Sequence, residues 1–241
     1  MKNQQFLKKL KKIIPDHIIP KFTNQKDLLH WHHKQGKLLS QKIIKQNKTL
    51  EIHDTFKKSG IRKLYMECSF NNYIIEHEGH KKVVHLAKKY AKNFNNNMSS
   101  FVFLGKPGTG KNHLAAAISN YLILRGKKVF MITISDLMST IKSTFNNINK
   151  KLTEEKFIKY LSKIDLLIFD EIGIQIESKY EKMIINQIIE HRSASKKPTG
   201  MLSNLNGFTI TKILGENIID RMKLGNSLWL NFNWTSYRRK K

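Results

Sequence analysis

The sequence predicts an α/β fold in which helices cover both faces of a five-stranded parallel sheet. From residue 100 onward, short apolar runs alternate with stretches of helical spacing. Runs that are apolar at consecutive positions are typical of strands buried on both faces, and the intervening stretches are long enough for right-handed crossovers. The expected strands are FVFL at 101–104, KVFMITI at 128–134, DLLIFD at 165–170, GMLSN at 200–204 and SLWLNF at 227–232.

Amphipathic stretches predict the helices and divide the chain into parts. In the sheet domain, helices are expected at 111–125, 136–145, 153–162, 179–192 and 208–223. The first 60 residues have a helical and polar pattern, are interrupted by Pro15 and Pro20, and hold few residues that could fill a core. We therefore expect a small helical N-terminal domain at 1–60, a linker and leading helix at 61–98, and the sheet domain at 99–241.

The charge of the chain favours a polyanionic partner. The 241 residues include 44 Lys and Arg against 18 Asp and Glu, a formal net charge of +26 at pH 7. Such a field attracts nucleic acid. Because Arg occurs at only six positions while Lys, Asn and Ile are abundant, drift toward AT-rich codons accounts for the charge equally well.

Cysteine content and hydropathy exclude several classes of protein. Cys68 is the only cysteine, so one chain can build neither a disulfide framework nor a thiolate metal cluster. The start of the chain lacks the apolar core of a signal peptide, and no stretch reaches the length of a membrane span. We expect a soluble, cytoplasmic protein with no membrane partner.

Residues 105–112, GKPGTGKN, have the G-x-x-x-x-G-K spacing of a phosphate-binding loop. The loop follows an expected strand and opens an expected helix. Its glycines let backbone N–H groups wrap phosphates, the helix N-terminus favours anions, and Lys111 reaches the outer phosphates. The residues expected to bind ATP are Gly105, Lys106, Pro107, Gly108, Thr109, Gly110, Lys111, Asn112 and His113.

An acidic pair ends the expected strand at 165–170 and predicts hydrolysis. Asp170 is expected to bind Mg²⁺, and Glu171 to orient and deprotonate the attacking water. Asn112 stands where the usual loop has a Ser or Thr hydroxyl for the metal. Because an amide oxygen is an acceptable Mg²⁺ ligand, we expect a working but slow ATPase with Asn112 and Asp170 as ligands, or with a water in place of Asn112.

Longer stretches resemble the DnaC family, the bacterial AAA+ loaders of the replicative helicase. The resemblance spans nearly the whole chain and includes the Asn after the loop Lys. It implies a P-loop AAA+ ATPase that binds the hexameric helicase, self-associates through its ATPase domain, and delivers the helicase onto single-stranded DNA. Because only nine residues follow Phe232, we expect no C-terminal lid. The matching runs are GKPGTGKNHLAAAI, LLIFDEIG, ESKYEKMIINQI, KKPTGMLSNLN and GNSLWLNFNW.

The resemblance also implies roles for single residues. Asn204 matches the sensor 1 residue, which contacts the attacking water or outer phosphate, although Asn often simply caps a turn. Arg221 matches the arginine finger that completes a neighbouring subunit's site, although it would also suit a solvated helix. Phe70 and Tyr73 match the linker near the nucleotide base and would equally suit a core.

Two binding surfaces are implied in the same way. Phe145, Ser178 and Tyr180 match residues that line the channel for single-stranded DNA, where aromatic rings stack on bases without regard to sequence. Phe145 would also suit a core position. The N-terminal helices match the part that grips the helicase. The residues expected to make this contact are Leu10, Ile13, Ile14, Leu29 and Trp31.

Other readings of these features remain. The segment at 6–14 has the pattern of a membrane-surface helix, although a helix that docks on a protein has the same pattern. HWHH at 30–33 places two His at helical spacing, but without Cys or acidic partners it does not predict a metal site. The alternative functions are a transposition-helper ATPase of related architecture and a basic nucleic-acid adaptor that binds ATP without turnover.

Overall fold

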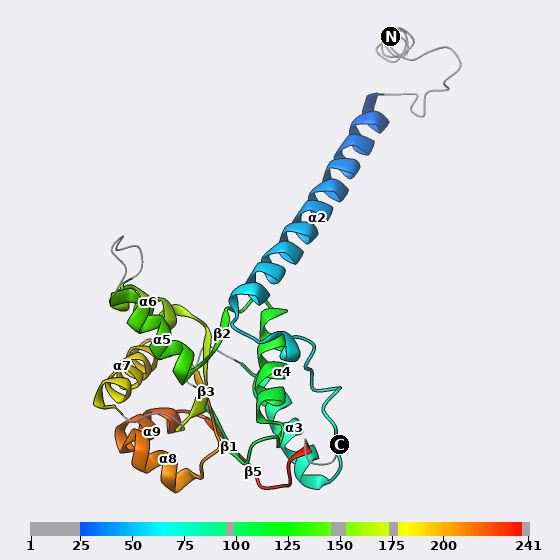
Figure 1. Cartoon of the computed structure of the whole chain (residues 1–241). Helices are drawn as coiled ribbons and strands as arrows, with labels where there is room; N and C mark the ends of the chain where they lie inside the picture. Colours follow the sequence, from blue (N-terminus) through cyan, green and yellow to red (C-terminus); the bar gives the residue numbers. More distant parts are fainter. Residues whose placement is uncertain (1–24, 95–98, 146–152, 174–177, 238–241) are drawn as a thin grey trace. The chain divides into compact units, whose positions relative to one another are not determined.

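The structure is a computed structural model that describes residues 25–94, 99–145, 153–173 and 178–237 (Figure 1). The chain divides into two units, Met1–Glu51 and Ile52–Lys241. Helix α2 (Gln25–Lys58) begins in the first unit and ends in the second. It carries exposed apolar side chains at Leu29, Leu38, Leu39, Ile43 and Ile44.

The second unit is built on a five-stranded sheet with all strand pairs parallel, in the order β2-β3-β4-β1-β5. Each strand lies within two residues of a predicted run, which confirms the predicted sheet. The strands are β1 (Phe101–Gly105), β2 (Val129–Thr133), β3 (Leu166–Ile172), β4 (Thr199–Ser203) and β5 (Leu228–Phe232).

Helices connect and flank the strands. The prediction of one helix at 208–223 is wrong, because Gly215, with φ +91°, ends one helix and begins another. The helical segments after α2 are η1 (Lys63–Tyr65), α3 (Glu78–Lys92), α4 (Lys111–Ile123), α5 (Ile134–Phe145), α6 (Glu154–Lys163), α7 (Lys179–Ala194), α8 (Gly207–Leu214) and α9 (Glu216–Lys223).

The two faces of the sheet carry separate apolar cores. Phe101 and Phe103 of β1 belong to the core that includes α3 and α4, whereas Val102 and Leu104 belong to the core that includes α5 to α9. Successive side chains of a strand point to opposite faces, so a strand covered on both faces must be apolar at every position. Figure 1 shows these two helical layers on either side of the sheet.

The segment before α3 is fastened to the sheet domain at two places. The amide of Met131 in β2 donates to the carbonyl of Ser59 at 2.8 Å. Gly60 follows in the left-handed region, and a Cβ there would collide with the Met131 carbonyl. Further on, the buried Asn120 side chain of α4 donates from Nδ2 to the carbonyls of Tyr65, Met66 and Cys68, at 2.8–3.1 Å. The linker is therefore held against the helix that follows the phosphate-binding loop.

One buried arginine ties α6, α7 and the start of β4 together. Arg192 has no exposed surface. Its guanidinium donates to the carbonyls of Leu161, Ile164 and Pro198 and to Oγ1 of Thr199. Burial lowers the pKa of Arg192 to about 9. These carbonyls depend on Arg192 for a hydrogen-bond donor, because they belong to buried residues that water does not reach.

We predict that Arg192→Met lowers the free energy of unfolding by about 3 kcal/mol, since it leaves buried carbonyls without donors. Urea unfolding followed by circular dichroism measures the change. The matched control is Arg125→Met, because Arg125 is exposed and lies 3.5 Å above the ring of Tyr121. We expect the control to lose less than about 1 kcal/mol. Equal losses in the two variants would contradict the role assigned to Arg192.

Candidate nucleotide-binding site

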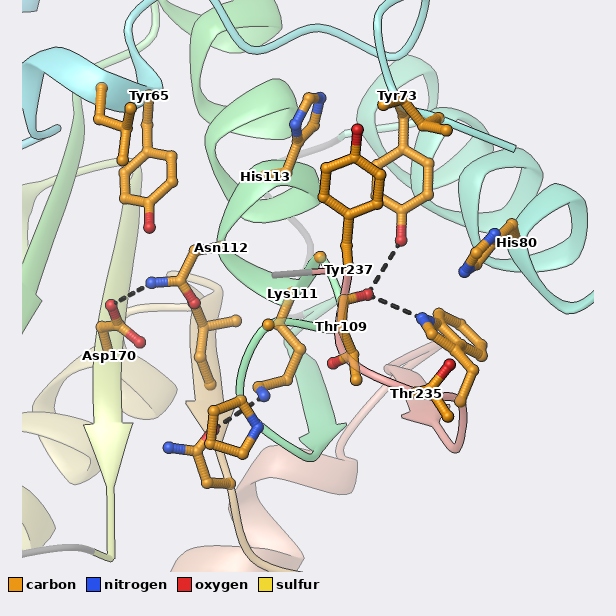
Figure 2. Close-up of a pocket in the computed structure, with 18 of the residues that line it drawn as sticks. Tyr65, Tyr73, His80, Thr109, Lys111, Asn112, His113, Asp170, Thr235 and Tyr237 are labelled. Carbon is orange, nitrogen blue, oxygen red and sulfur yellow. Dashed lines mark hydrogen bonds between the residues drawn. The ribbon is translucent and has the colours of Figure 1, made fainter. Parts of the chain in front are cut away.

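The candidate site lies at the carboxyl ends of three neighbouring strands. Because β4 pairs with both β1 and β3, the residues that follow these strands meet at one edge of the sheet. A cavity of about 460 Å³ opens there, within the range of small-molecule pockets. The phosphate-binding loop, the acidic pair, Asn204, the linker and the segment after β5 line it (Figure 2).

The phosphate-binding loop has the backbone shape that its glycines permit. Gly108 and Gly110 have φ values of +77° and +95°, which other residues adopt only with strain. A Cβ at Gly110 would collide with the hydroxyl of Tyr73 and lie 2.8 Å from its ring. Helix α4 begins at Lys111, so its first N–H groups, which have no partner within the helix, lie beside the loop.

Lys111 is buried at the centre of the site. It is 5% exposed, and its Nζ donates to the carbonyls of Gly105 at 2.5 Å and Lys106 at 2.9 Å and to Oδ1 of Asn204 at 2.9 Å. Burial lowers the pKa of Lys111 to about 8, and the nearby charge of Asp170 opposes this shift. An anion placed here would supply the countercharge that the three neutral oxygens lack.

Asn112 is joined to the acidic pair. Its Nδ2 donates to Oδ2 of Asp170 at 2.6 Å (Figure 2). The backbone amide of Glu171 donates to Oδ1 of the same carboxylate at 2.8 Å. Burial and the charge of Glu171 raise the pKa of Asp170, while the two hydrogen bonds oppose the rise. The amide oxygen of Asn112 is thereby turned away from the carboxylate. A side-chain amide oxygen is a suitable ligand for Mg²⁺.

Strand β3 is distorted at the acidic pair. Glu171 has φ +59°, and the register between β3 and β4 shifts between Phe169 and Ile172. Asp170 stays buried in the strand, whereas Glu171 is exposed, and both line the cavity. A non-glycine residue in the left-handed region costs about 1–3 kcal/mol and is typical of functional sites. The distortion brings both carboxylates to the cavity from one strand.

Not all the expected loop residues occupy equivalent places. Residues 107–113 line the cavity, whereas Gly105 and Lys106 contribute the carbonyls that hold Lys111. The His113 ring faces the linker, with Nε2 3.1 Å from the carbonyl of Ser69 and 3.0 Å from Oδ1 of Asn72. It therefore joins the cavity wall to the linker.

Arg221 does not belong to the cavity of its own chain. It lies beside Ser100 and Thr199, which precede or begin strands at the edge of the sheet opposite the phosphate-binding loop. Its guanidinium donates to Oδ1 of Asn186 at 3.1 Å and to Oε1 of Glu190 at 3.2 Å. Any action of Arg221 on a nucleotide must therefore involve another chain.

The residues expected to bind DNA also lie away from the cavity. Phe145 is the last residue of α5. Ser178 caps the N-terminus of α7 by accepting from the amide of Glu181 at 3.1 Å. The hydroxyl of Tyr180 donates to Oε2 of Glu154, which begins α6, at 2.8 Å. This bond joins the starts of α6 and α7.

Sequence reasoning missed much of the cavity wall. Tyr73 lines the cavity as expected, but Phe70 does not and instead packs edge-on against Tyr121, with ring centres 6.0 Å apart. The segment after β5 contributes Trp234 and Tyr237, which the sequence analysis did not single out. The one signal for them was a short aromatic stretch, NWTSY, directly after the last strand.

Leu10, Ile13 and Ile14, expected to contact the helicase, lie outside the described residues. Leu29 is 61% exposed on α2, and Trp31 is partly buried. The described part of the chain contains no group of three or more His, Cys, Asp and Glu residues that could hold a metal ion. No helix within it combines the length and the apolar content needed to cross a membrane.

Comparison with known proteins identifies relatives over almost the whole chain. Residues 60–241 match the family model described as IstB-like ATP binding protein. A curated protein of Buchnera aphidicola subsp. Baizongia pistaciae, named replicative helicase loader DnaC, is 61% identical over 100% of this chain and 98% of its own length. The protein of the same name from Escherichia coli K12 is 52% identical over 99% of this chain and 97% of its own length.

Among solved structures, the crystal structure of the DnaC helicase loader is similar in fold. It aligns with a TM-score of 0.61 and 22% identity, covering 70% of this chain and 99% of the solved chain. At this identity the likeness supports the fold alone. It agrees with the predicted AAA+ P-loop architecture and its five-stranded parallel sheet.

We predict that Gly110→Ala weakens ATP binding at least about tenfold, because the new Cβ meets Tyr73 in a backbone conformation that disfavours side chains. Isothermal titration calorimetry measures the affinity. The matched control is Gly126→Ala, since Gly126 also has positive φ, +78°, but a Cβ there meets nothing within 4 Å. Equal affinities in the two variants would show that the Tyr73 contact does not shape the loop.

Proposed function

We propose that this chain, which belongs to the family of DnaC replicative helicase loaders, binds the hexameric replicative helicase and delivers it onto single-stranded DNA, with ATP as the switch. The observation that carries the proposal is the likeness to curated loaders over nearly the full length of the chain. The assembled ATP site supports it, because the loop, the acidic pair and Asn204 surround one cavity.

The contacts of the site suggest what each residue does when ATP binds. The phosphates would replace the carbonyls that now hold Lys111, while Asn204 stays within reach of the same amine. Glu171 is proposed to orient the attacking water and take its proton. Its exposure at the cavity, beside a buried neighbour, supports this role. Bound Mg²⁺ would neutralise developing phosphate charge, and Asn112 and Asp170 are the side chains proposed to hold it.

Arg221 is proposed to complete the site of a neighbouring copy. It lies far from its own cavity, and its bonds to Asn186 and Glu190 are partly solvent-exposed, so a phosphate could compete for the guanidinium. Self-association through residues 99–241 would then couple ATP turnover to assembly. Because an isolated chain would lack this arginine in its own site, we expect its turnover to be slow.

The other partners are assigned to other surfaces. Residues 1–60 are proposed to bind the helicase, and the exposed Leu and Ile side chains of α2 support this role. Residues 61–98 serve as linker and leading helix. Phe145, Ser178 and Tyr180 are proposed to contact single-stranded DNA from the ends of α5 and α7.

We predict that steady-state ATP hydrolysis exceeds a Lys111→Ala background and rises when single-stranded DNA is added. Glu171→Gln should lower turnover at least about 100-fold while ATP binding persists, because the amide cannot accept a proton. Phosphate release and equilibrium binding measure the two effects. Retention of the helicase on the protein during size-exclusion chromatography tests the partner.

Two results would replace this proposal. ATP binding without turnover, unchanged by Glu171→Gln and with the helicase present, would indicate the nucleic-acid adaptor. Filaments on duplex DNA without helicase retention would indicate the transposition helper.

We further predict that Asn112→Ala reduces the gain in ATP affinity that Mg²⁺ provides over EDTA by about tenfold, because it removes an oxygen ligand and frees Asp170. Asn112→Ser, which restores a hydroxyl, should retain most of the gain. Titrations with and without Mg²⁺ measure it. An unchanged gain in Asn112→Ala would assign the ligand position to water.

A further inference from the structure

Two carbonyl groups of the phosphate-binding loop accept hydrogen bonds from the segment after β5. The carbonyl of Thr109 accepts from Nε1 of Trp234 at 2.9 Å and from the hydroxyl of Tyr73 at 3.1 Å (Figure 2). The carbonyl of Gly108 accepts from the amide of Tyr237 at 3.0 Å. The segment at 233–237, which we call the tail, therefore supplies two donors to the loop.

The tail is fixed at its base by the sheet. Phe232 of β5 lies in register with Gly105 of β1, where the loop begins, so loop and tail leave the sheet side by side. Trp234 then packs edge-on against His80, with ring centres 4.6 Å apart, and against His77 at 5.2 Å. These contacts with the start of α3 determine where its indole N–H points.

The loop needs such partners because of how it holds phosphate. When consecutive N–H groups of a loop turn inward to an anion, the carbonyls of the same peptides turn outward. An outward carbonyl without a donor pays a desolvation penalty, and rotation of the peptide would relieve it. Thr109 is 3% exposed, so water cannot easily serve its carbonyl. Donors from the tail thus oppose the rotation that would spoil the phosphate site.

Trp229 provides a comparison within the same strand region. Its Nε1 is buried without a hydrogen-bond partner among the described residues. The two indoles therefore differ in their hydrogen bonding: Trp234 donates to the loop, whereas Trp229 has no acceptor within the described part of the chain. Packing of the indole ring therefore does not by itself provide a hydrogen-bond acceptor for the N–H.

We propose that Trp234 and the tail backbone hold the phosphate-binding loop in its anion-binding shape, so that the tail sets the affinity of the site for polyphosphate. Trp234 is then a positioning residue, acting through the carbonyl of Thr109. The inference rests on the proposed ATP binding and adds which segment controls it. It concerns the phosphates of the ligand and not the base.

The first test compares Trp234→Phe with Trp229→Phe in the full-length protein. Both keep an aromatic ring and remove an indole N–H, but only the first removes a bond to the loop. Affinities for ATP and for inorganic tripolyphosphate are measured by calorimetry, with thermal unfolding as the check on folding. Trp234→Phe should lower the affinity for both ligands by a similar factor of about three to ten, the effect of one hydrogen bond. Trp229→Phe should weaken neither.

The second test removes a backbone donor at Tyr237 and does not depend on Trp234. Tyr237→Pro lacks the N–H that bonds Gly108, whereas Tyr237→Ala keeps the N–H and loses only the ring. Tripolyphosphate should bind about threefold or more weakly to the Pro variant than to the Ala variant, which separates the loss of the N–H from the loss of the ring. This pair keeps the proposal testable if Trp234→Phe fails to fold.

The outcomes separate this inference from the function on which it rests. If the unaltered protein binds no ATP, the proposed function fails. If it binds ATP and both ligands bind normally to Trp234→Phe and Tyr237→Pro, the tail does not position the loop. If Trp234→Phe weakens the binding of ATP but not of tripolyphosphate, Trp234 contacts the base and the inference is overturned.

Discussion

The buried charge of Lys111 is the constraint on which the rest of the site depends. Lys111 is 5% exposed, and a buried ammonium group loses hydration, which is costly unless oxygen atoms surround it. Two carbonyls at the start of the loop and one amide oxygen after β4 meet this need. They can do so only because β4 lies directly beside β1. The order of the strands and the shape of the loop are thus coupled through one side chain.

The negative charge of Asp170 is stabilised by hydrogen bonds from neutral groups. Asp170 is buried as well, but it accepts from the amide nitrogen of Asn112 and from the backbone of Glu171, and it is not paired directly with Lys111. An amide at position 112 can donate to a carboxylate with one end and offer an oxygen with the other, whereas a hydroxyl must use one atom for both. Asn112, at the position where the usual loop has Ser or Thr, can therefore hold Asp170 with its nitrogen and still present an oxygen.

The sequence predicted the sheet well because burial on both faces leaves a strong pattern of consecutive apolar residues, as in FVFL and LLIF. It also indicated the loop and the acidic pair from their residue patterns, and Asn204 through the family resemblance. In the structure these residues line one cavity, because parallel strands bring their carboxyl ends to one edge. It did not predict the break at Gly215, since the apolar spacing continues through it. Nor did it predict Arg192 in the core, because its partners are carbonyls, which no side-chain pattern encodes.

The hydrogen bonds that the tail and the linker donate to the loop escaped prediction for a related reason, and they have a consequence. Tyr73 and Trp234 are distant in sequence from the loop and have no periodicity, yet both donate to the carbonyl of Thr109. One acceptor shared by two donors couples them, because the position of the carbonyl depends on both hydrogen bonds at once. The linker is fixed in turn to α4 by Asn120 and joined to it by His113. Movement of the linker would therefore reach the phosphate-binding loop both through α4 and through the carbonyl that the tail also holds.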